Sequence, residues 1–347
     1  MNLQQCTLTW GDQILLPCAP ALRIVENGVV VPKAQPGAYD FDTQWGVFDA
    51  SGARVEAAAY RRGPGLNYVG QGPYLTVAAD QIVRSEQPLV IYGGVGHSHF
   101  GHFMVSTLAR LWIAGSSSAP PGTKYLFHLD QSPAEWFSVP FVADSLAGLG
   151  IFLDDVIRVE APTRYDTLLA PEPSFEETRS FHPCFRETAL RIGDALTADS
   201  GITPGSAVYL SKERLPGGVK RFENEAELVG CLRAEGVTIV YPEMLTLAQQ
   251  VDLFRKASIV VGSLSSAFHT TILSSEPVRL VGLCHDSNVF STFKMIDRLT
   301  GNPALYLHQA ATATGQTDPH FMSTFRLADP RSAAQDLLRV IEGVAAF

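Results

Sequence analysis

Short apolar runs alternate with longer amphipathic stretches through the second half of the sequence, and this alternation constrains the fold more than any other feature. The apolar runs predict strands at Ala207–Leu210, Val237–Tyr241, Ser258–Val261 and Val278–Leu283. Parallel strands need a crossover between them, and a helix is the usual crossover. A chain with this alternation is therefore expected to fold as an α/β domain around a parallel sheet.

The predicted crossover helices carry start and stop signals. Asn224 is the expected cap of one helix, with Glu227 three residues further on completing a capping box and Gly236 ending it. Thr246 is the expected cap of the next helix, over 247–257. These signals place the helices between the predicted strands, as an α/β domain requires.

The first half of the chain repeats the alternation less clearly. Strands are expected at Pro88–Tyr92, Lys124–Leu129 and Val156–Glu160, and helices at Phe100–Ala114 and Val139–Leu149. The first 85 residues read as strands and turns instead, with a β-hairpin over Val47–Val55. This half is therefore expected to be a second α/β domain with a β-rich start.

Two domains of ordinary size fit a length of 347 residues. The Pro-rich stretch Ala161–Pro183 is interpreted as the connection between them. We predict an N-terminal α/β domain over 1–180, a Rossmann-like domain over 181–330, and a C-terminal helix within 331–347. This last helix is expected to pack back on the first domain.

Charge and composition narrow the class of partner. The net charge is −9 and the pI is near 5.5, which argues against a nucleic-acid partner because such partners require a basic surface. Five cysteines are scattered without a C-x-x-C pair, which favours reduced thiols over a disulfide framework or a zinc site. With no signal-peptide pattern and no apolar run of about 18 residues, we expect the cytoplasm or the inner surface of the membrane.

The sequence from Gly93 to His102 is the first candidate site. It follows a predicted strand, precedes a predicted helix and holds three of the nine histidines, namely His97, His99 and His102. Ligands bind at the carboxyl ends of parallel strands, and imidazole is suited to proton transfer near neutral pH. A catalytic or substrate-binding role is one interpretation, and a structural role or an H-x-H-x-x-H metal site are the alternatives.

The second candidate site is the basic stretch from Ser211 to Arg221. It carries four cations and one carboxylate in eleven residues and follows a predicted strand. Arginine gives forked hydrogen bonds and lysine a point charge, so this stretch suits a diphosphate. A solvated basic loop is the alternative.

The third candidate site is the turn within 260–271. A predicted strand breaks at Gly262 into small residues that open a helix. Backbone N–H groups there, with the hydroxyls of Ser265, Ser266 and Thr270, could hold phosphate oxygens. Serine and threonine also serve as ordinary helix caps, so a structural role is the alternative.

Four stretches of the chain together form a known pattern. They are Phe100–Trp112, with G-H-F and R-L-W; Val208–Arg221, followed by Asn224 and Glu225; Tyr241–Val251, similar to P-E-x-L-S/T-x-x-E-Q-V; and Ala257–Gly262 with Ser266–Thr270, similar to A-D-V-V-V-G-x-x-G-S-A-L-H-N. Their order and separations, from about residue 90 to 285, resemble glycosyltransferase family 61. The resemblance is closer to its bacterial members of the capsular-polysaccharide type.

The resemblance implies a GT-B fold of two facing Rossmann-like domains. It also implies metal-independent, inverting transfer of a hexosyl or pentosyl group from a nucleotide-diphosphate sugar to a saccharide or lipid-linked saccharide, in surface-polysaccharide synthesis. The nucleotide sugar would be a co-substrate, with no cofactor and no metal. The first domain would bind the acceptor and the second the donor, and a homodimer is compatible with this scheme.

The resemblance and the residue chemistry together give the candidate site residues. The expected catalytic residues are His102, as the general base, and His99, as the alternative base. The expected substrate-binding residues are Gly94, Gly96, His97, Gly101 and Arg110. The expected nucleotide-binding residues are Ser211, Lys212, Arg214, Arg221, Glu243, Gln250, Gly262, Ser265, Ser266, His269 and Thr270.

Two pairs of residues depart from the family pattern. Leu264–Ser265 stands where many relatives have H-G or Y-G, and Gln249–Gln250 stands where they have E-Q. Because the first departure falls in the expected donor loop, a non-catalytic nucleotide-sugar-binding partner in a polysaccharide assembly is the alternative function. A metal hydrolase built on the three histidines is a further alternative.

Overall fold

The computed structural model of the protein describes residues 2–33, 45–63, 67–69, 71–309, 313–314 and 320–343. Its contacts divide the chain into two compact units. The N-terminal unit comprises residues 11–195, and the C-terminal unit comprises 1–10 together with 196–347. The division between these units falls at 195/196, whereas the sequence suggested a domain boundary at 180/181, and the first ten residues belong with the C-terminal unit.

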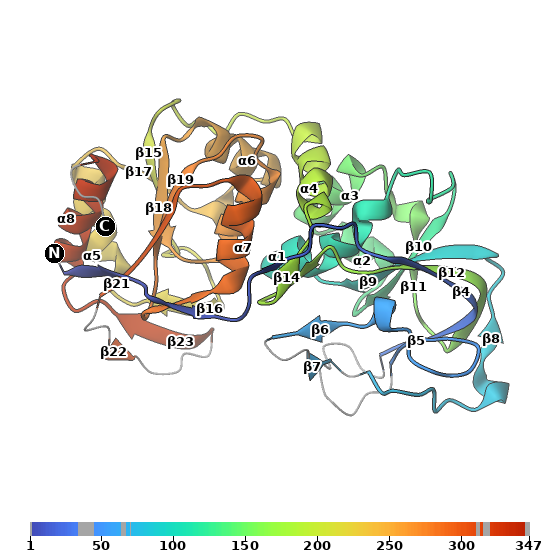
Figure 1. Ribbon diagram of the computed structural model, residues 1–347. Helices are drawn as coiled ribbons and strands as arrows, with labels where there is room; N and C mark the ends of the chain where they lie inside the picture. The colour runs from blue at the N-terminus through green and yellow to red at the C-terminus, as the bar shows by residue number, and fades with distance from the viewer. Residues whose placement is uncertain are drawn as a thin grey trace. The chain divides into compact units, whose positions relative to one another are not determined.

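A six-stranded sheet forms the centre of the C-terminal unit (Figure 1). Its strands, in spatial order, are β1 (Leu3–Gln5), β21 (Ala304–Gln309), β19 (Arg279–Leu283), β18 (Ile259–Ser263), β15 (Ala207–Leu210) and β17 (Thr238–Val240). The five strands from β21 to β17 are parallel, and β1 pairs antiparallel at the edge. The four strands predicted between 207 and 283 are confirmed.

The order of the parallel strands reverses direction between β15 and β18. From β15 the chain passes to β17 on one side, and then returns to β18, β19 and β21 on the other. Open α/β sheets bind ligands at the carboxyl ends of their strands, at such a switch point. In this unit the switch point lies where β15 ends at Leu210 and β18 ends at Ser263.

Helices cover both faces of this sheet (Figure 1). One face packs against α5 (Glu225–Ala234) and α8 (Pro330–Ile341), and the other against α6 (Leu247–Lys256), the 3₁₀ helix η7 (Ser266–Leu273) and α7 (Ser291–Thr300). Successive residues of β15 point to opposite faces, so Tyr209 is buried on the first and Val208 and Leu210 on the second. Both faces of the parallel sheet are therefore buried.

The C-terminal helix α8 packs within its own unit. Its Ala333, Leu337 and Val340 recur at spacings of three and four and are buried with Leu228 and Leu232 of α5. The prediction that this helix packs back on the first domain is wrong, because its apolar stripe is already buried against α5.

The predicted helix starts have different outcomes. At α6 the capping box is confirmed, since the Thr246 hydroxyl accepts from the Gln249 N–H at 3.2 Å and the Gln249 side chain accepts from the Thr246 N–H at 3.1 Å. At α5 the predicted N-cap position is confirmed, since the helix begins directly after Asn224, but the Asn224 side chain does not form the predicted capping box. The Asn224 amide instead donates to the Leu327 carbonyl at 2.9 Å and accepts from the Leu327 N–H at 3.0 Å, so it ties α5 to the segment before α8.

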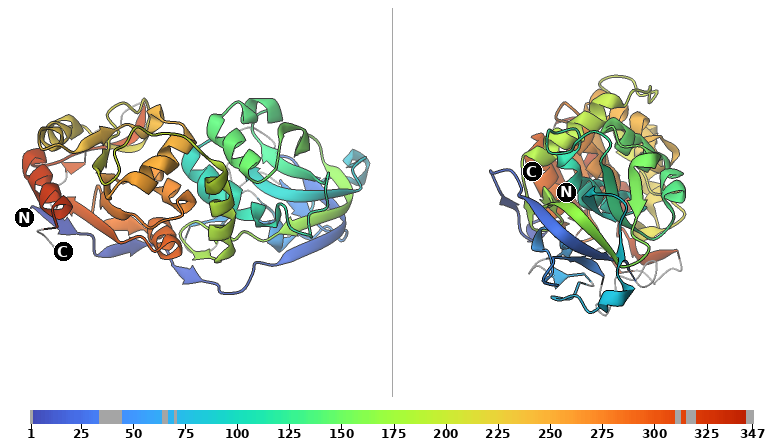
Figure 2. Two further views of the ribbon diagram at one scale, coloured as in Figure 1. Left: turned by 90° about the horizontal axis from the view of Figure 1, so that it is seen from above. Right: turned by 90° about the vertical axis from the view of Figure 1, so that its right-hand side faces the viewer.

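The N-terminal segment completes the C-terminal unit. Strand β1 pairs with β21, and the N–H of Leu3 donates to the buried carboxylate of Asp336 in α8 at 2.9 Å. Figure 2 shows the first strand beside the last helix. Residues from the two ends of the chain thus share one hydrophobic core, which includes Leu3, Leu307 and Leu337.

The sheet of the N-terminal unit is mixed. Its main path, in spatial order, is β11 (Val156–Arg158), β10 (Lys124–Leu129), β9 (Leu89–Gly96), β12 (Thr163–Pro171), β4 (Leu22–Val31) and β5 (Gly46–Phe48), with β8 (Val83–Arg84) pairing with β12. The first four strands are parallel, while β4 and β5 are antiparallel to their neighbours. The expected parallel order is therefore confirmed for β9 to β11, but the sheet as a whole is not parallel.

Strand β12 corrects the interpretation of the Pro-rich stretch. The predicted connection at 161–183 contains a central strand whose Leu168 and Ala170 are buried. Its prolines do not interrupt the sheet, because Pro162 precedes the strand and Pro171 is its last residue. Proline content alone therefore gave a wrong prediction here.

The predicted helix over 100–114 is helical but irregular. It consists of one α-helical turn, α1 (Phe100–His102), a π-helical turn over Phe103–Thr107 and a 3₁₀ turn over Leu108–Ile113. The other helices of this unit are α2 (Pro133–Phe137), α3 (Pro140–Gly148) and α4 (Cys184–Ala195). The predicted hairpin over 47–55 is confirmed by an antiparallel bridge between Phe48 and Arg54.

Short strands and 3₁₀ helices complete the described structure. They are β2 (Leu8–Trp10), β3 (Ile14–Leu15), β6 (Arg61–Arg62), β7 (Asn67–Tyr68), β13 (Phe175–Glu176), β14 (Ser180–Phe181), β16 (Gly218–Phe222), β20 (Asn288–Phe290), β22 (Ala313–Thr314), β23 (Phe321–Arg326), η1 (Glu56–Ala58), η2 (Ala79–Gln81), η5 (Leu153–Asp155) and η6 (Pro242–Met244). None of the helices in the described part of the chain has the length and apolar content needed to span a membrane.

Two glycine substitutions in the C-terminal unit should have opposite effects on stability, because a Cβ atom has no room at Gly262 and meets no neighbour at Gly230. A Cβ atom at Gly262 would lie 2.6 Å from the Leu210 carbonyl oxygen, so Gly262→Ala should lower the free energy of unfolding by about 1–3 kcal/mol. At Gly230 in α5 a Cβ would meet no described atom within 4 Å, so Gly230→Ala should raise it by about 0.5–1 kcal/mol. Urea unfolding measures both, and equal stability of Gly262→Ala and the wild type would contradict the prediction.

Candidate functional site

Lys212 lies at the switch point of the C-terminal unit, two residues after the end of β15. Its ammonium donates to the carbonyl oxygens of Lys220 at 3.0 Å and of Leu264 at 3.3 Å, and so joins the middle of β16 (Gly218–Phe222) to the turn after β18. Burial lowers the pKa of Lys212 to about 8, although the nearby Glu225 acts in the opposite direction. The side chain therefore remains mostly protonated at pH 7.

Glu225 is a buried carboxyl group at the start of α5. It accepts hydrogen bonds from the Tyr209 hydroxyl at 2.9 Å and from the Lys212 N–H at 3.1 Å. Burial raises its pKa to about 7, against the lowering effect of these hydrogen bonds and of the Lys212 charge. Glu225 therefore fixes the backbone at Lys212 and is well placed to position that residue.

The other cations of the second candidate site lie on different elements. Arg214 is exposed, and its guanidinium lies 4.1 Å from the Tyr241 ring centroid. Arg221 belongs to β16, and its guanidinium lies 4.5 Å from the Phe321 ring centroid. Ser211 is buried, and its hydroxyl donates to Glu213 at 3.2 Å. The predicted basic loop is thus a loop only as far as residue 217.

The turn after β18 brings the predicted small residues to the same edge. Gly262 lies within β18, Ser265 precedes η7, and Ser266 is its first residue. The carbonyl group of Leu264 accepts from Lys212, so this turn and the Lys212 loop are neighbours. Both serines are half-buried.

The remaining predicted nucleotide-binding residues hold helices together. The Thr270 hydroxyl donates to the Gln250 side-chain oxygen at 3.2 Å, and the Gln250 amide donates to the Pro242 carbonyl at 3.0 Å. These bonds join η7, α6 and η6. Glu243 lies in η6, where burial raises its pKa, and His269 is buried with its ring 5.0 Å from that of Phe293.

His285 is a residue of this edge that the sequence analysis missed. It follows β19, and its ring stacks on Phe222 at a centroid distance of 4.4 Å and lies 4.7 Å from Phe325. Burial and the charges of Lys212 and Lys220 lower its pKa to about 2, so the imidazole is neutral. Its Nε2 atom is buried without a hydrogen-bond partner among the described residues. A histidine two residues after a predicted strand was the available signal.

In the N-terminal unit, His102 is held by a carboxylate and an arginine. Its Nδ1 lies 2.8 Å from Glu177 Oε1, and its Nε2 lies 3.2 Å from an Arg62 nitrogen. The Ser106 hydroxyl donates to the same Glu177 oxygen at 2.9 Å. Because arginine can only donate, Nε2 accepts, and the proton of the neutral ring is on Nδ1. A histidine oriented by a carboxylate in this way is suited to act as a general base.

The other two histidines of the cluster surround His102. The ring centroids of His97 and His99 lie 5.4 and 4.9 Å from that of His102. Burial and the charge of His102 lower the pKa of His97 to about 3, and the same causes lower the pKa of His99. His97 is buried, and its carbonyl accepts from the Trp136 indole. This contact fits the structural alternative, and the substrate-binding role expected of His97 stays a prediction.

The predicted glycines and Arg110 are packing residues in this geometry. A Cβ at Gly94 would lie 2.8 Å from Arg110, and one at Gly96 would lie 2.2 Å from Leu129. Gly101 is buried in α1. Arg110 is buried and donates to the carbonyl oxygens of Ala57, Ala59 and Pro171. These close contacts explain why positions 94 and 96 are glycine, and a substrate-binding role for these residues stays a prediction.

Glu177 was also missed by the sequence analysis. It lies in the turn between β13 and β14, next to Thr178, which has a φ of 58°. A β-branched residue in the left-handed region is a strained conformation, and such strain often accompanies functional sites. The sequence gives no local signal for this turn, and residues 161–183 were interpreted as a connection between domains.

The described ranges contain no group of three or more His, Cys, Asp or Glu side chains placed to hold a metal ion. Metal independence stays a prediction. The Glu177–His102 pair is a two-residue arrangement, and His97 and His99 contact His102 through their rings.

A comparison with protein-family models decides the family. The model described as Glycosyltransferase 61 matches residues 100–281, which is more than half of the chain. The chain belongs to glycosyltransferase family 61. The matched range contains His102, Glu177 and the switch point at Lys212, so the family pattern covers part of a candidate site in each unit. No curated protein matches the sequence significantly.

The family assignment supports glycosyl transfer as the activity of this chain. It implies that a sugar donor and an acceptor are the substrates of family 61 proteins such as this one.

The buried Glu177 carboxylate predicts a pH dependence of stability. Burial acts to raise its pKa, but the hydrogen bond and charge of His102, with Arg62 and Ser106, outweigh burial and lower it to about 2. A carboxyl group whose pKa is lowered by folding stabilises the folded state at pH values above its pKa in the unfolded chain, near 4.3. This contribution is lost as the pH falls toward 2. Glu177→Gln should therefore cost about 1–3 kcal/mol at pH 7 and less at pH 3.

Urea unfolding of the wild type and Glu177→Gln at several pH values measures this difference. Glu160→Gln, a change at an exposed carboxylate of the same unit, is the control and should show little effect at either pH. A constant difference between the wild type and Glu177→Gln from pH 7 to pH 3 would contradict the prediction.

Proposed function

We propose that this family 61 protein transfers a hexosyl or pentosyl group from a nucleotide-diphosphate sugar to a hydroxyl of a saccharide or lipid-linked saccharide, with inversion and without a metal, in surface-polysaccharide synthesis. The C-terminal unit binds the donor and the N-terminal unit binds the acceptor. The observation that carries the proposal is the Lys212 ammonium at the switch point, beside the turn after β18.

The donor end of the reaction needs fixed positive charge. When the glycosidic bond of the donor breaks, the electron pair goes to the diphosphate, whose charge must be met by cations and N–H dipoles if no metal does so. One such preorganised donor contributes about 3–4 kcal/mol in other enzymes. Lys212, Arg214 and the N–H groups around Ser265 and Ser266 fill this role in the proposal.

The acceptor end needs a base. The acceptor oxygen attacks the anomeric carbon and gives its proton to His102 Nε2, while Glu177 stabilises the imidazolium that forms. In the described structure Nε2 accepts from Arg62, so Arg62 must release this atom before a hydroxyl can take its place. His99 is the alternative base.

The proposal is tested by incubating the protein with a panel of nucleotide sugars and saccharide acceptors, with and without EDTA. We expect transfer in both conditions. The alternative is a non-catalytic nucleotide-sugar-binding partner, favoured by Leu264–Ser265 in the donor turn. Binding of a nucleotide sugar without transfer or hydrolysis would favour this alternative, and transfer that needs added manganese or zinc would contradict metal independence.

Donor affinity should depend on the cations at the switch point. Changing Lys212 and Arg214 together to Ala should weaken nucleotide-sugar binding about 100-fold or more, because two charge-assisted contacts of about 1.5–3 kcal/mol each are lost. Since Lys212 also bonds two carbonyls, thermal unfolding must first show that the double variant is folded. Arg279→Ala, at an exposed cation of the same unit, is the control. Unchanged affinity in a folded double variant would contradict the prediction.

The base assigned to His102 predicts a separation of kcat from donor affinity. His102→Ala should lower kcat by about 10²–10⁴-fold and leave the donor Kd nearly unchanged. Glu177→Gln should lower kcat less, because the base remains and only its orientation and charge stabilisation change. A folded His102→Ala variant that keeps its kcat but raises the acceptor KM would make His102 a binding residue.

A further inference from the structure

Two exposed aromatic rings lie at the edge of the C-terminal unit. Strands β2 and β20 form a parallel ribbon in which Trp10 and Phe290 are register partners. Their rings meet edge to face with centroids 5.0 Å apart, yet Trp10 is 45% exposed and Phe290 43%. Exposed aromatic surface of this kind commonly marks a binding site.

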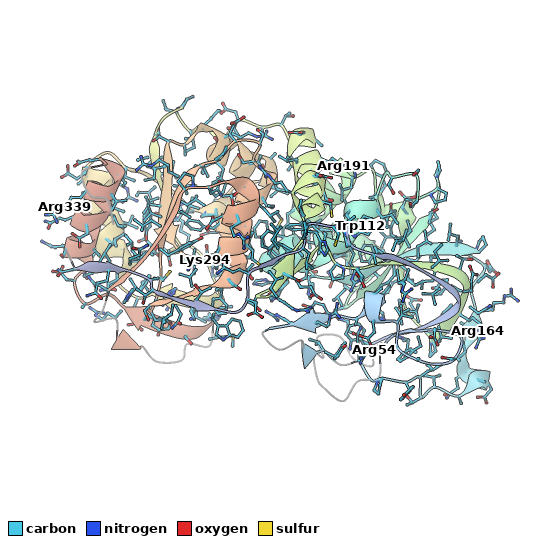
Figure 3. All side chains as sticks on the ribbon, viewed as in Figure 1. Arg54, Trp112, Arg164, Arg191, Lys294 and Arg339 are labelled. Carbon is cyan, nitrogen blue, oxygen red and sulfur yellow. The ribbon has the colours of Figure 1, made fainter. Side chains whose placement is uncertain are left out.

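The ribbon that carries these rings is anchored. Val289, the middle residue of β20, is fully buried, and Phe290 directly precedes α7. Lys294 of α7, labelled in Figure 3, donates to the Thr9 hydroxyl of β2 at 2.6 Å. The rings are therefore held in place before any ligand arrives, which lowers the entropy cost of binding to them.

A cation lies beside this aromatic pair. The Lys220 ammonium is 5.9 Å from the Phe290 ring centroid and 5.6 Å from that of Phe325. The carbonyl of Lys220 accepts from Lys212, and His285, whose buried Nε2 has no hydrogen-bond partner in the described chain, packs on Phe325. Groups that suit phosphate oxygens therefore lie next to groups that suit a planar ring.

A nucleotide has the matching order of groups. One ribose separates its planar base from its phosphates, so a site for it needs an aromatic surface and a cation close together. Bases stack on aromatic side chains with little dependence on base identity, because every base has a π-face.

We propose that Trp10 and Phe290 form the stacking platform for the base of the nucleotide donor, and that Lys220 contacts its phosphates. This inference rests on the proposed function, and it adds Trp10, from the first ten positions of the sequence, to the donor site. It also implies modest discrimination between bases, since stacking supplies the contact.

Calorimetry with the full chain tests the platform, using UDP, ADP and inorganic pyrophosphate as probes. Trp10→Leu and Phe290→Leu should each weaken the binding of both nucleotides about 5- to 100-fold and leave the affinity for pyrophosphate unchanged. Lys220→Met should weaken the binding of all three probes. Phe152→Leu, at an exposed aromatic residue of the N-terminal unit that is 59% exposed, is the control and should change none of them.

Tryptophan fluorescence gives a second readout. Nucleotide binding should quench the tryptophan fluorescence of the wild type, and this quenching should be smaller in Trp10→Leu at saturating nucleotide. Folded Trp10→Leu and Phe290→Leu variants with wild-type nucleotide affinity would overturn the platform, and an altered oligomeric state in such variants would make the pair a protein-docking surface instead. Absence of binding of all three probes to the wild type would overturn the donor site itself.

Discussion

One ammonium group holds the carboxyl edge of the C-terminal sheet together. Lys212 bonds carbonyls from two segments, and the Glu225 carboxyl group accepts a hydrogen bond from its backbone N–H. The two strands of the switch point approach so closely that position 262 has no room for a side chain. A positive charge is thereby fixed at the sheet edge of a chain whose net charge is −9, and it produces a local field that favours anions.

The C-terminal unit could largely be predicted from sequence because its signals are local. Apolar runs gave the strands, and Thr246 gave a helix start. What could not be predicted depends on partners far along the chain. The Asn224 amide forms hydrogen bonds with the Leu327 backbone, and the apolar face of α8 packs against α5. Neither contact can be read from the sequence next to the residues that form it.

The N-terminal unit was harder to predict, both in its fold and in its candidate site. Strand β12 is flanked by prolines, so its composition resembles a linker although its position in the sheet is central. Glu177 is 75 positions from His102, and only the folded hairpin between β13 and β14 brings the two together. The His102 and Lys212 motifs were recognisable because their residues lie next to predicted strands, whereas the residues that orient them were not.

The N-terminal strand has a consequence for folding during synthesis. Leu3 bonds to Asp336, a residue 333 positions later, and β1 pairs with β21 near the end of the chain. Residues 3–5 are synthesised long before residues 304–309 and Asp336, so β1 can reach its place only after these later residues have been made. The C-terminal unit therefore closes late, through a contact of very high sequence separation, and its formation is expected to be slower than that of the contiguous unit made before it.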